Sequence, residues 1–132
     1  MAKIRVLLAD DHETIQQRVK AVLAGGNFEI VASVKNGRDA VVETQRLDPD
    51  VLVIDISMPE MDGLQAARQM QSRKLRTKIV FLTVHEDEDF VTAAFAAGAS
   101  AYVTKARVTT DLLPAIHDAL EGHKYVSASI SM

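Results

Sequence analysis

Four apolar segments of the sequence each lead to a side chain able to handle a phosphoryl group. The acidic pair Asp10 and Asp11 follows the first segment and Asp55 follows the second, while Thr83 and Lys105 close the other two. If the segments are parallel strands, their carboxyl ends lie along one edge of a sheet, so these side chains meet in one crevice. Carboxylates, a hydroxyl and an ammonium together suit binding of a divalent cation and phosphoryl transfer to an aspartate.

Clustering the three carboxylates carries an electrostatic cost. Two carboxylates about 4 Å apart repel each other by roughly 4 kcal/mol at an effective dielectric constant of about 20. A hard cation with spare coordination sites, such as Mg²⁺, offsets this repulsion and is usually completed by phosphate oxygens. We therefore expect the acidic cluster to be strained without a metal ion and relieved by one.

Each of these features has a simpler explanation when it is taken alone. An Asp pair after a strand is commonly a helix N-cap, and a single Asp such as Asp55 is commonly a turn former. Thr83 is an ordinary residue for a strand end, and Lys105 would ordinarily be a solvated surface charge. The occurrence of all four features, in order and at separate strand ends, is what favours a shared site.

The rest of the chain alternates between strand-like and helix-like segments. Runs rich in Val, Ile, Leu and Phe predict strands near 3–9, 28–34, 51–55, 78–83 and 100–104. Between them apolar residues recur at helical spacing, most clearly at Ile15, Val19, Val22 and Leu23. The last helix is predicted to begin at the N-cap cluster 109–111 and to end at Gly122, with Pro114 near its first turn.

This alternation predicts the fold class. Five strands, each followed by a helix, require a parallel sheet covered on both faces, and right-handed crossovers make an open doubly wound sheet the most economical arrangement. A closed eight-stranded barrel would need about 250 residues, whereas the chain has 132. The sequence therefore predicts a single α/β domain.

Composition excludes several classes of protein. The chain is 48% apolar, which is enough for a core, and it has no cysteine, so disulfides and thiolate metal sites are excluded. No apolar stretch approaches the roughly 20 residues of a membrane span, and no signal peptide is expected. The net charge of −3 argues against direct nucleic-acid binding by this segment. The histidines lack zinc-helix spacing and are expected to be solvent-facing or loop residues: His12, His85, His117 and His123.

Segment 50–63, DVLVIDISMPEMDG, resembles the phosphoacceptor strand and loop of response-regulator receiver domains of two-component signalling. With Asp10, Asp11, Thr83 and Lys105, the resemblance covers residues 3–122. It implies a flavodoxin-like fold with a five-stranded parallel sheet of order 2-1-3-4-5 and five helices. It also implies that Asp55 accepts a phosphoryl group from a sensor histidine kinase, so that the chain catalyses only its own phosphotransfer and dephosphorylation.

The same resemblance implies a metal-binding set. Asp11 and Asp55 would ligate Mg²⁺, or Mn²⁺ in its place, directly. Asp10 would act largely through water, and the backbone carbonyl of Ser57 would complete the protein ligands. The acidic cluster and its expected need for a cation agree with these roles.

Further roles follow for the phosphoryl group and the switch. Thr83 and Lys105 would hold the phosphoryl oxygens next to Asp55, and the new charge would pull both side chains inward. Movement of Thr83 would open space that the ring of Tyr102 fills, which would make Thr83 and Tyr102 the switch residues. The alternative for Tyr102 is a plain core position.

The sequence departs from the family pattern at positions next to the site. Lys105 is followed by Ala106, where many receivers carry proline. Val84 is larger than the small residue that many receivers place after the Thr, and we expect it to crowd the phosphate site. Ser57, Val84 and His85 are the residues expected to tune dephosphorylation.

The carboxyl-terminal part is similar to regulators in which the receiver precedes a LuxR/NarL-like helix-turn-helix domain. The similar segments are 98–105, 112–116 and 122–127. We expect residues 123–132 to be a tail or the start of a linker, with residues 125–132 the frayed end of the domain. DNA contact and control of transcription would then need an output domain outside this chain. A cytoplasmic location, no membrane contact and a homodimer formed on phosphorylation are expected.

Other functions remain open at this point. A stand-alone receiver or a pseudo-receiver that is never phosphorylated would act through protein contacts alone. A flavin carrier would need a phosphate loop rich in Ser, Thr and Gly after the first strand, where Asp10 and Asp11 stand instead. An aspartate-based phosphatase would need a carboxylate two residues after its nucleophile, where Ser57 stands.

Overall fold

The computed structural model of the chain describes residues 2–128 and 130. Its centre is a six-stranded sheet of order β2-β1-β3-β4-β5-β6, in which every neighbouring pair is parallel. The strands are β1 Ile4–Ala9, β2 Phe28–Val34, β3 Val51–Ile54, β4 Lys78–Thr83, β5 Ala101–Thr104 and β6 Tyr125–Val126. The predicted order of the first five strands is therefore confirmed.

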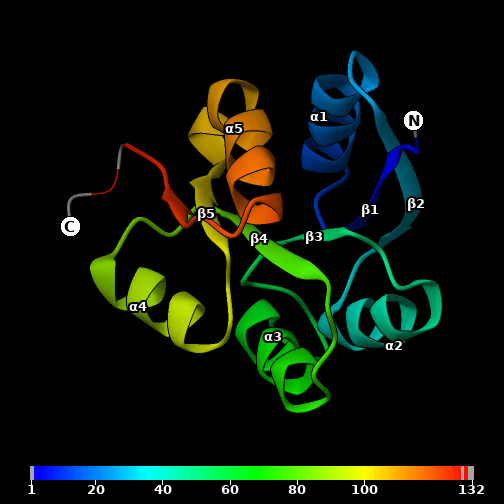
Figure 1. Cartoon of the computed structure of the whole chain (residues 1–132). Helices are drawn as coiled ribbons and strands as arrows, with labels where there is room; N and C mark the ends of the chain where they lie inside the picture. Colours follow the sequence, from blue (N-terminus) through cyan, green and yellow to red (C-terminus); the bar gives the residue numbers. More distant parts are fainter. Residues whose placement is uncertain (1, 129, 131–132) are drawn as a thin grey trace.

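The helices cover both faces of the sheet, as a doubly wound, flavodoxin-like fold requires (Figure 1). Helices α1 and α5 lie together on one face, and α2, α3 and α4 lie on the other. The helical elements are α1 Glu13–Ala24, α2 Gly37–Leu47, α3 Gly63–Ser72, α4 Glu88–Ala96, the short 3₁₀ turn η1 Lys105–Arg107 and α5 Val108–Leu120. Within residues 2–128 and 130, none of the helices is both long and apolar enough to cross a bilayer.

Successive side chains of a strand point to opposite faces of the sheet, so the strands contribute to two hydrophobic cores, one under each layer of helices. Leu7, Ile54 and Phe81 belong to the core under α2, α3 and α4. Leu8 and Val53 belong to the core under α1 and α5. All the residues of β3 are fully buried, which explains why its sequence is apolar without alternation.

The register of the strands brings their carboxyl ends to one level. Ala9 of β1 pairs with Ile54 of β3, and Ile54 pairs with Phe81 of β4. The backbone N–H of Asp55 donates to the carbonyl of Ala9 at 3.0 Å, which fixes Asp55 beside the residue that follows β1. The strand ends predicted from the sequence therefore converge along one edge of the sheet.

Side-chain hydrogen bonds cap the first turns of α2 and α3, which lie on the same face of the sheet. The Asn36 side chain accepts a hydrogen bond from the Asp39 N–H at the start of α2. Asp62 and Gln65 form a reciprocal capping box at the start of α3. The loop between β3 and α3 is therefore anchored at the point where α3 begins.

The carboxyl-terminal part differs from the prediction in two ways. Residues 125–126 are not frayed but form β6, which pairs with Ala101 and Tyr102 of β5. Helix α5 begins at Val108, directly after η1, so the predicted N-cap cluster 109–111 lies inside the helix and Pro114 lies in its second turn. The physical reason is that Asp111 is buried and bonded to other side chains instead of capping the helix. The predicted domain boundary at residue 122 stays a prediction.

Candidate functional site

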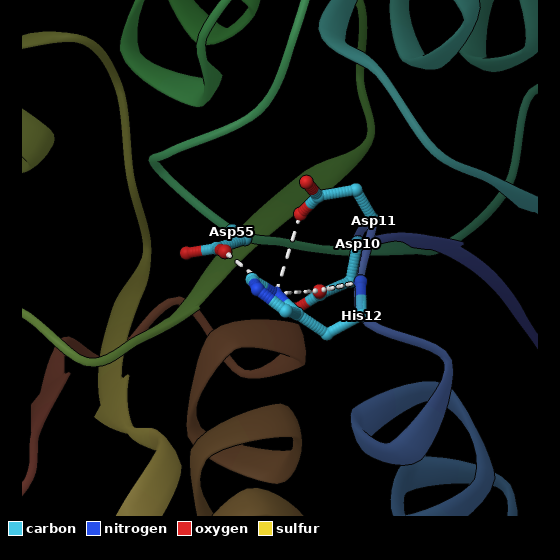
Figure 2. A group of neighbouring side chains, drawn as sticks. All are labelled: Asp10, Asp11, His12 and Asp55. Atoms are coloured by element: carbon cyan, nitrogen blue, oxygen red, sulfur yellow. Dashed lines mark hydrogen bonds and ion pairs between the residues drawn. The ribbon is translucent and has the colours of Figure 1, made fainter.

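The three predicted carboxylates meet at the ends of β1 and β3 (Figure 2). Asp10 is 1% exposed and Asp55 is 3% exposed, while Asp11 reaches the surface. The Asp10 N–H donates to the carbonyl of Val34 at 3.0 Å, and the Gln16 side chain donates to the carbonyl of Asp10 at 2.6 Å. Strands β1 and β2 and helix α1 thus hold the backbone of the acidic pair.

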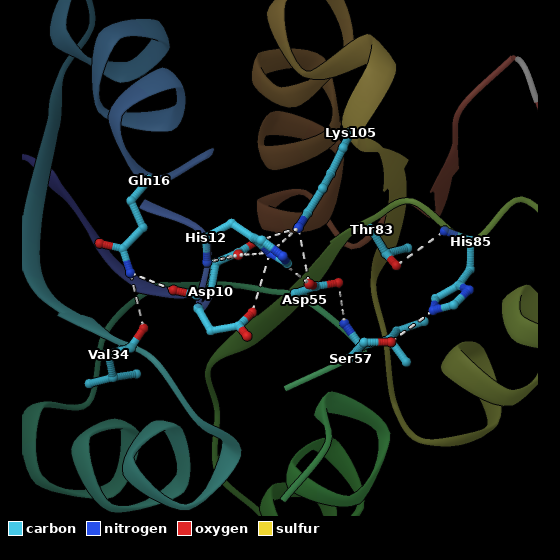
Figure 3. Close-up of polar contacts among 11 residues, drawn as sticks. Asp10, His12, Gln16, Val34, Asp55, Ser57, Thr83, His85 and Lys105 are labelled. Atoms are coloured by element: carbon cyan, nitrogen blue, oxygen red, sulfur yellow. Dashed lines mark hydrogen bonds and ion pairs between the residues drawn. The ribbon is translucent and has the colours of Figure 1, made fainter. Parts of the chain in front are cut away.

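Lys105 lies between the two buried carboxylates (Figure 3). Its Nζ is 2.9 Å from Asp10 Oδ2 and 3.0 Å from Asp55 Oδ2. Burial lowers the pKa of Lys105, but the bonds to Asp10 and Asp55 outweigh that effect, so its pKa lies above the ordinary value. The expectation of an uncompensated acidic cluster is therefore modified, because the Lys105 ammonium already offsets part of the repulsion.

His12 also belongs to the cluster, a position that was not predicted from the sequence. Its Nδ1 lies 3.1 Å from Asp10 Oδ1, 3.3 Å from Asp11 Oδ1 and 3.3 Å from Lys105 Nζ. The backbone N–H of His12 donates to Asp10 Oδ1 at 2.8 Å, which orients that carboxylate. The position of His12, directly after the Asp pair, was the signal in the sequence that could have identified it.

The donor set fits the divalent metal ion predicted from the sequence. Ligand atoms of Asp10, Asp11, His12 and Asp55 all lie within 4.8 Å of one another. Carboxylate oxygens are hard ligands of the kind that Mg²⁺ and Mn²⁺ prefer, and the partly exposed Asp11 leaves room for water or phosphate. The cluster is therefore able to bind a divalent cation.

The loop after β3 orients Asp55 through the backbone of Ile56. Asp55 Oδ1 accepts a hydrogen bond from the Ile56 N–H at 2.7 Å, and the Gly63 N–H donates to the carbonyl of Ile56 at 2.7 Å. A Cβ at position 63 would overlap the Asp55 carbonyl, so only glycine permits this close approach. This packing is the structural reason for Gly63 at the end of segment 50–63.

Thr83, Ser57 and His85 form the other side of the site (Figure 3). Thr83 is fully buried at the end of β4, and its Oγ1 accepts a hydrogen bond from the His85 N–H at 3.3 Å. His85 Nε2 lies 2.9 Å from Ser57 Oγ, and the His85 ring stacks on Phe90 with centroids 4.1 Å apart. The loops after β3 and β4 are therefore joined beside Asp55.

Tyr102 lies below these loops in the middle of β5. Its ring is fully buried and packs near Phe81, and its hydroxyl donates to the carbonyl of His85 at 2.8 Å. Burial, followed by the nearby negative charge of Asp55, raises the pKa of the Tyr102 hydroxyl. The ring already occupies the core in this structure, so any response to Thr83 would start from this inward position.

Val84 lines a pocket at the rim of the site. Its side chain is exposed and, with His12, Ile15 and Lys105, lines an open pocket of about 400 Å³. An apolar residue at this rim would lose contact with water when a partner docks. Its effect on access to the phosphate site stays a prediction.

Comparisons with known proteins agree with the geometry. Residues 6–117 match the family model of the response regulator receiver domain. The chain is 33% identical over 130 residues to the transcriptional regulatory protein DegU of Brevibacillus brevis, which covers 98% of this chain and 55% of that protein. It is 31% identical over 127 residues to the nitrate/nitrite response regulator protein NarL of Escherichia coli K12, which covers 96% of this chain and 59% of that protein.

Solved structures show the same architecture. A two-component response regulator of the LuxR family from Aurantimonas sp. SI85-9A1 superposes with a TM-score of 0.90 at 28% identity, covering 98% of this chain and 93% of that chain. The chain spans a little more than half the length of the curated relatives DegU and NarL. The matched family model, these relatives and the converging aspartates lead to one conclusion: the chain belongs to the response regulator receiver domain family, the phosphoacceptor module of two-component signalling.

Proposed function

We propose that Asp55 is the residue that accepts the phosphoryl group, and that its donor is a phosphohistidine of a sensor histidine kinase. The observation that carries the proposal is the placement of Asp55 at the end of β3, with Oδ2 bonded to Lys105 and Oδ1 bonded to the Ile56 N–H. Asp10 is also buried and also contacts Lys105 through Oδ2, but its Oδ1 is contacted by both the backbone N–H and the ring Nδ1 of His12. Within the described residues, the only hydrogen-bond donor to Asp55 Oδ1 is the Ile56 N–H. Asp11 lies at the surface of the cluster, where it suits metal binding.

The transfer forms one bond and breaks another. A carboxylate oxygen of Asp55 attacks the phosphorus, the P–N bond of the phosphohistidine breaks, and the bonding electrons leave with the imidazole, which is protonated. Lys105 moves from the carboxylate pair to the new phosphoryl oxygens, and the Thr83 hydroxyl donates a hydrogen bond to them. A bound Mg²⁺ or Mn²⁺, held by Asp10, Asp11, Asp55 and the Ser57 carbonyl, would supply further positive charge at the phosphoryl oxygens.

The fate of the acyl phosphate depends on the residues around it. Ser57 and His85 are joined by their side chains, so we infer that together they control the approach of hydrolytic water to Asp55. Val84 at the rim would limit access further. The chain thus catalyses only its own phosphotransfer and dephosphorylation, and it acts as a switch.

The output is proposed to be control of transcription. One relative is named a transcriptional regulatory protein, and the chain spans only 55% of its length. We infer a cytoplasmic regulator whose Thr83 and Tyr102 carry the switch, with homodimer formation on phosphorylation and DNA contact through a separate output domain. A stand-alone receiver or a pseudo-receiver acting by protein contact is the alternative.

Intact-mass measurement after incubation with Mg²⁺ and acetyl phosphate or phosphoramidate tests the site assignment. The wild-type protein should gain one phosphoryl group, and Asp55→Asn should gain none. Asp89→Asn is the matched control, since Asp89 is an exposed aspartate in the first turn of α4. Equal labelling of Asp55→Asn and wild type would refute the assignment, and no labelling of the wild type would favour the pseudo-receiver.

A further inference from the structure

The turn that carries Lys105 is attached at both ends to one pair of side chains, Asp111 and Ser127. At its start, the Thr104 N–H donates to Ser127 Oγ at 3.1 Å. At its end, Arg107 Nε donates to Asp111 Oδ2 at 2.9 Å. Ser127 Oγ in turn donates to Asp111 Oδ2 at 2.7 Å, which joins the two attachments. The backbone before Lys105 and the Arg107 side chain after it are therefore both bonded to this pair.

The pair is buried and well supplied with hydrogen bonds. Asp111 is 3% exposed and Ser127 is 1% exposed. Burial raises the pKa of Asp111, but the bonds from Arg107, Ser127 and Thr110 outweigh it, so the carboxyl pKa lies below its usual value. A buried carboxylate held by several donors has little freedom to move, because each lost bond would leave an unpaired polar group.

Ser127 belongs to the carboxyl-terminal segment 125–130, a name that here covers only its described residues 125–128 and 130. This segment also contacts the strand of the predicted switch residue. Val126 pairs with Tyr102, and the Ser127 N–H donates to the carbonyl of Tyr102 at 2.9 Å. Ile130 is 7% exposed and packs in the same hydrophobic core as Tyr102. One segment after α5 thus reaches both the Tyr102 strand and the Lys105 turn.

We propose that Ser127 and Asp111 are positioning residues for Lys105, and that docking of segment 125–130 and capture of the phosphoryl group are coupled. The inference rests on the proposed role of Lys105 in holding phosphoryl oxygens. Docking of the segment fixes the turn from which Lys105 reaches the site, so it favours capture. By thermodynamic reciprocity, capture of the phosphoryl group must stabilise docking of the segment by the same factor.

Binding of the acyl-phosphate mimic BeF₃⁻ in the presence of Mg²⁺ measures this coupling without covalent chemistry. Ser127→Ala should bind BeF₃⁻ about fivefold more weakly than wild type, at the lower end of typical coupling between sites. Lys124→Ala is the matched control, because Lys124 is an exposed residue of the same region whose ammonium lies over the Phe95 ring, away from Lys105. Its affinity should equal that of the wild type.

A second measurement uses the wild-type protein alone. Hydrogen exchange of the amides of residues 125–128 and 130 should slow when Mg²⁺ and BeF₃⁻ are added, because capture stabilises docking. This result does not depend on the folding of any variant. Asp111→Asn, which keeps the shape of the side chain, should reproduce the weaker binding of Ser127→Ala.

The possible outcomes separate this inference from the proposed function. A purely structural role predicts a lower free energy of unfolding for Ser127→Ala with unchanged BeF₃⁻ affinity, and that result would overturn the inference alone. Unchanged exchange in segment 125–130 of the BeF₃⁻-bound wild type would also overturn it. Failure of the wild type to bind BeF₃⁻ would instead refute the proposed function, and the coupling with it.

Discussion

The hydroxyl of Tyr102 donates a hydrogen bond to the backbone carbonyl of His85 at 2.8 Å. The same His85 reaches Ser57 through its side chain and Thr83 through its N–H. The ring in the core and the loop beside the phosphoacceptor are therefore connected by one residue. Any displacement of the loop after β4 must lengthen or break the contact with Tyr102.

Tyr102→Phe should lower the free energy of unfolding by about 1 kcal/mol, because it removes one buried hydrogen bond and leaves the His85 carbonyl without that donor. The ring itself and its packing near Phe81 are retained. Urea denaturation followed by circular dichroism measures the change. A transition identical to that of the wild type would show that the hydrogen bond contributes nothing.

The two members of the acidic pair should differ in their effect on metal affinity. Asp10→Asn should weaken Mg²⁺ binding about tenfold. This is the lower end of the effect seen when a residue that acts on a metal ion through a water or another ligand is removed. Asp11→Asn should weaken it more, because Asp11 is proposed to be a direct ligand. Calorimetric titration of both variants and the wild type with Mg²⁺ checks the order. Equal affinities in all three proteins would contradict it.

Removal of Lys105 should strengthen Mg²⁺ binding while it impairs phosphorylation. The ammonium lies about 3 Å from both Asp10 and Asp55 and competes with a metal ion for their oxygens. We expect Lys105→Ala to bind Mg²⁺ about tenfold more tightly, or about 1.4 kcal/mol. The expected gain is smaller than the Coulomb interaction energy of two unit charges about 4 Å apart, which is roughly 4 kcal/mol at an effective dielectric constant of about 20. Weaker Mg²⁺ binding in Lys105→Ala, with the fold intact, would mean that the lysine supports the metal site.

Two helix N-caps offer a matched comparison of stability. Asn36→Ala should cost about 1 kcal/mol, since the Asn36 side chain accepts the Asp39 N–H at 2.8 Å. Asp87→Ala should cost less, because Asp87 occupies the N-cap of α4 but its side chain makes no capping hydrogen bond within the described part of the chain. Thermal unfolding of both variants measures the difference. Equal losses would show that the Asn36 bond is not what stabilises α2.

The stability of the protein should fall in acid partly through Asp111. Its pKa is lower in the folded than in the unfolded state, so its contribution is present above the unfolded pKa and is lost as the pH falls through the folded pKa. When the Asp111 carboxylate is protonated, it loses its ion pair with Arg107. Tyr125 lies near the same carboxylate. As the pH falls from about 5 through the ordinary aspartate pKa of about 4 and below it, the unfolding free energy of Asp111→Asn should therefore fall less steeply than that of the wild type. If the unfolding free energies of the two proteins changed with pH in parallel, Asp111 would not contribute to the loss of stability in acid.

Much of the fold and the site was predictable because burial on both faces leaves a direct signal in the sequence. The apolar runs marked the first five strands, and the polar residues at the ends of four of these runs marked the reactive edge. Side-chain reach is not visible in such patterns, so the bridge from Lys105 to Asp10 and the turn of His12 toward the carboxylates were missed. Strand β6 was missed because two residues, Tyr125 and Val126, carry no periodicity and pair only through tertiary contact with β5.

The start of α5 was misplaced for a related reason. Thr109, Thr110 and Asp111 have the residue types of an N-cap, but that preference is weaker than the demand for partners inside the protein. Asp111 is buried against Ser127 and Arg107, so the helix begins at Val108 instead. The N-cap preference therefore gave the wrong helix start, because Ser127, which is distant in the sequence, forms a stronger interaction with Asp111.

The separation of the site residues at the strand ends from the exposed surfaces of the helices has an evolutionary consequence. The reactive side chains stand at or just beyond the ends of strands, while the outward surfaces of the helices carry ordinary exposed residues such as Gln17, Gln45 and Gln69. We expect substitutions on these surfaces to leave the acidic cluster and Lys105 in place. Duplicated copies of such a protein can therefore acquire separate upstream and downstream contacts, which insulates parallel signalling routes within one cell.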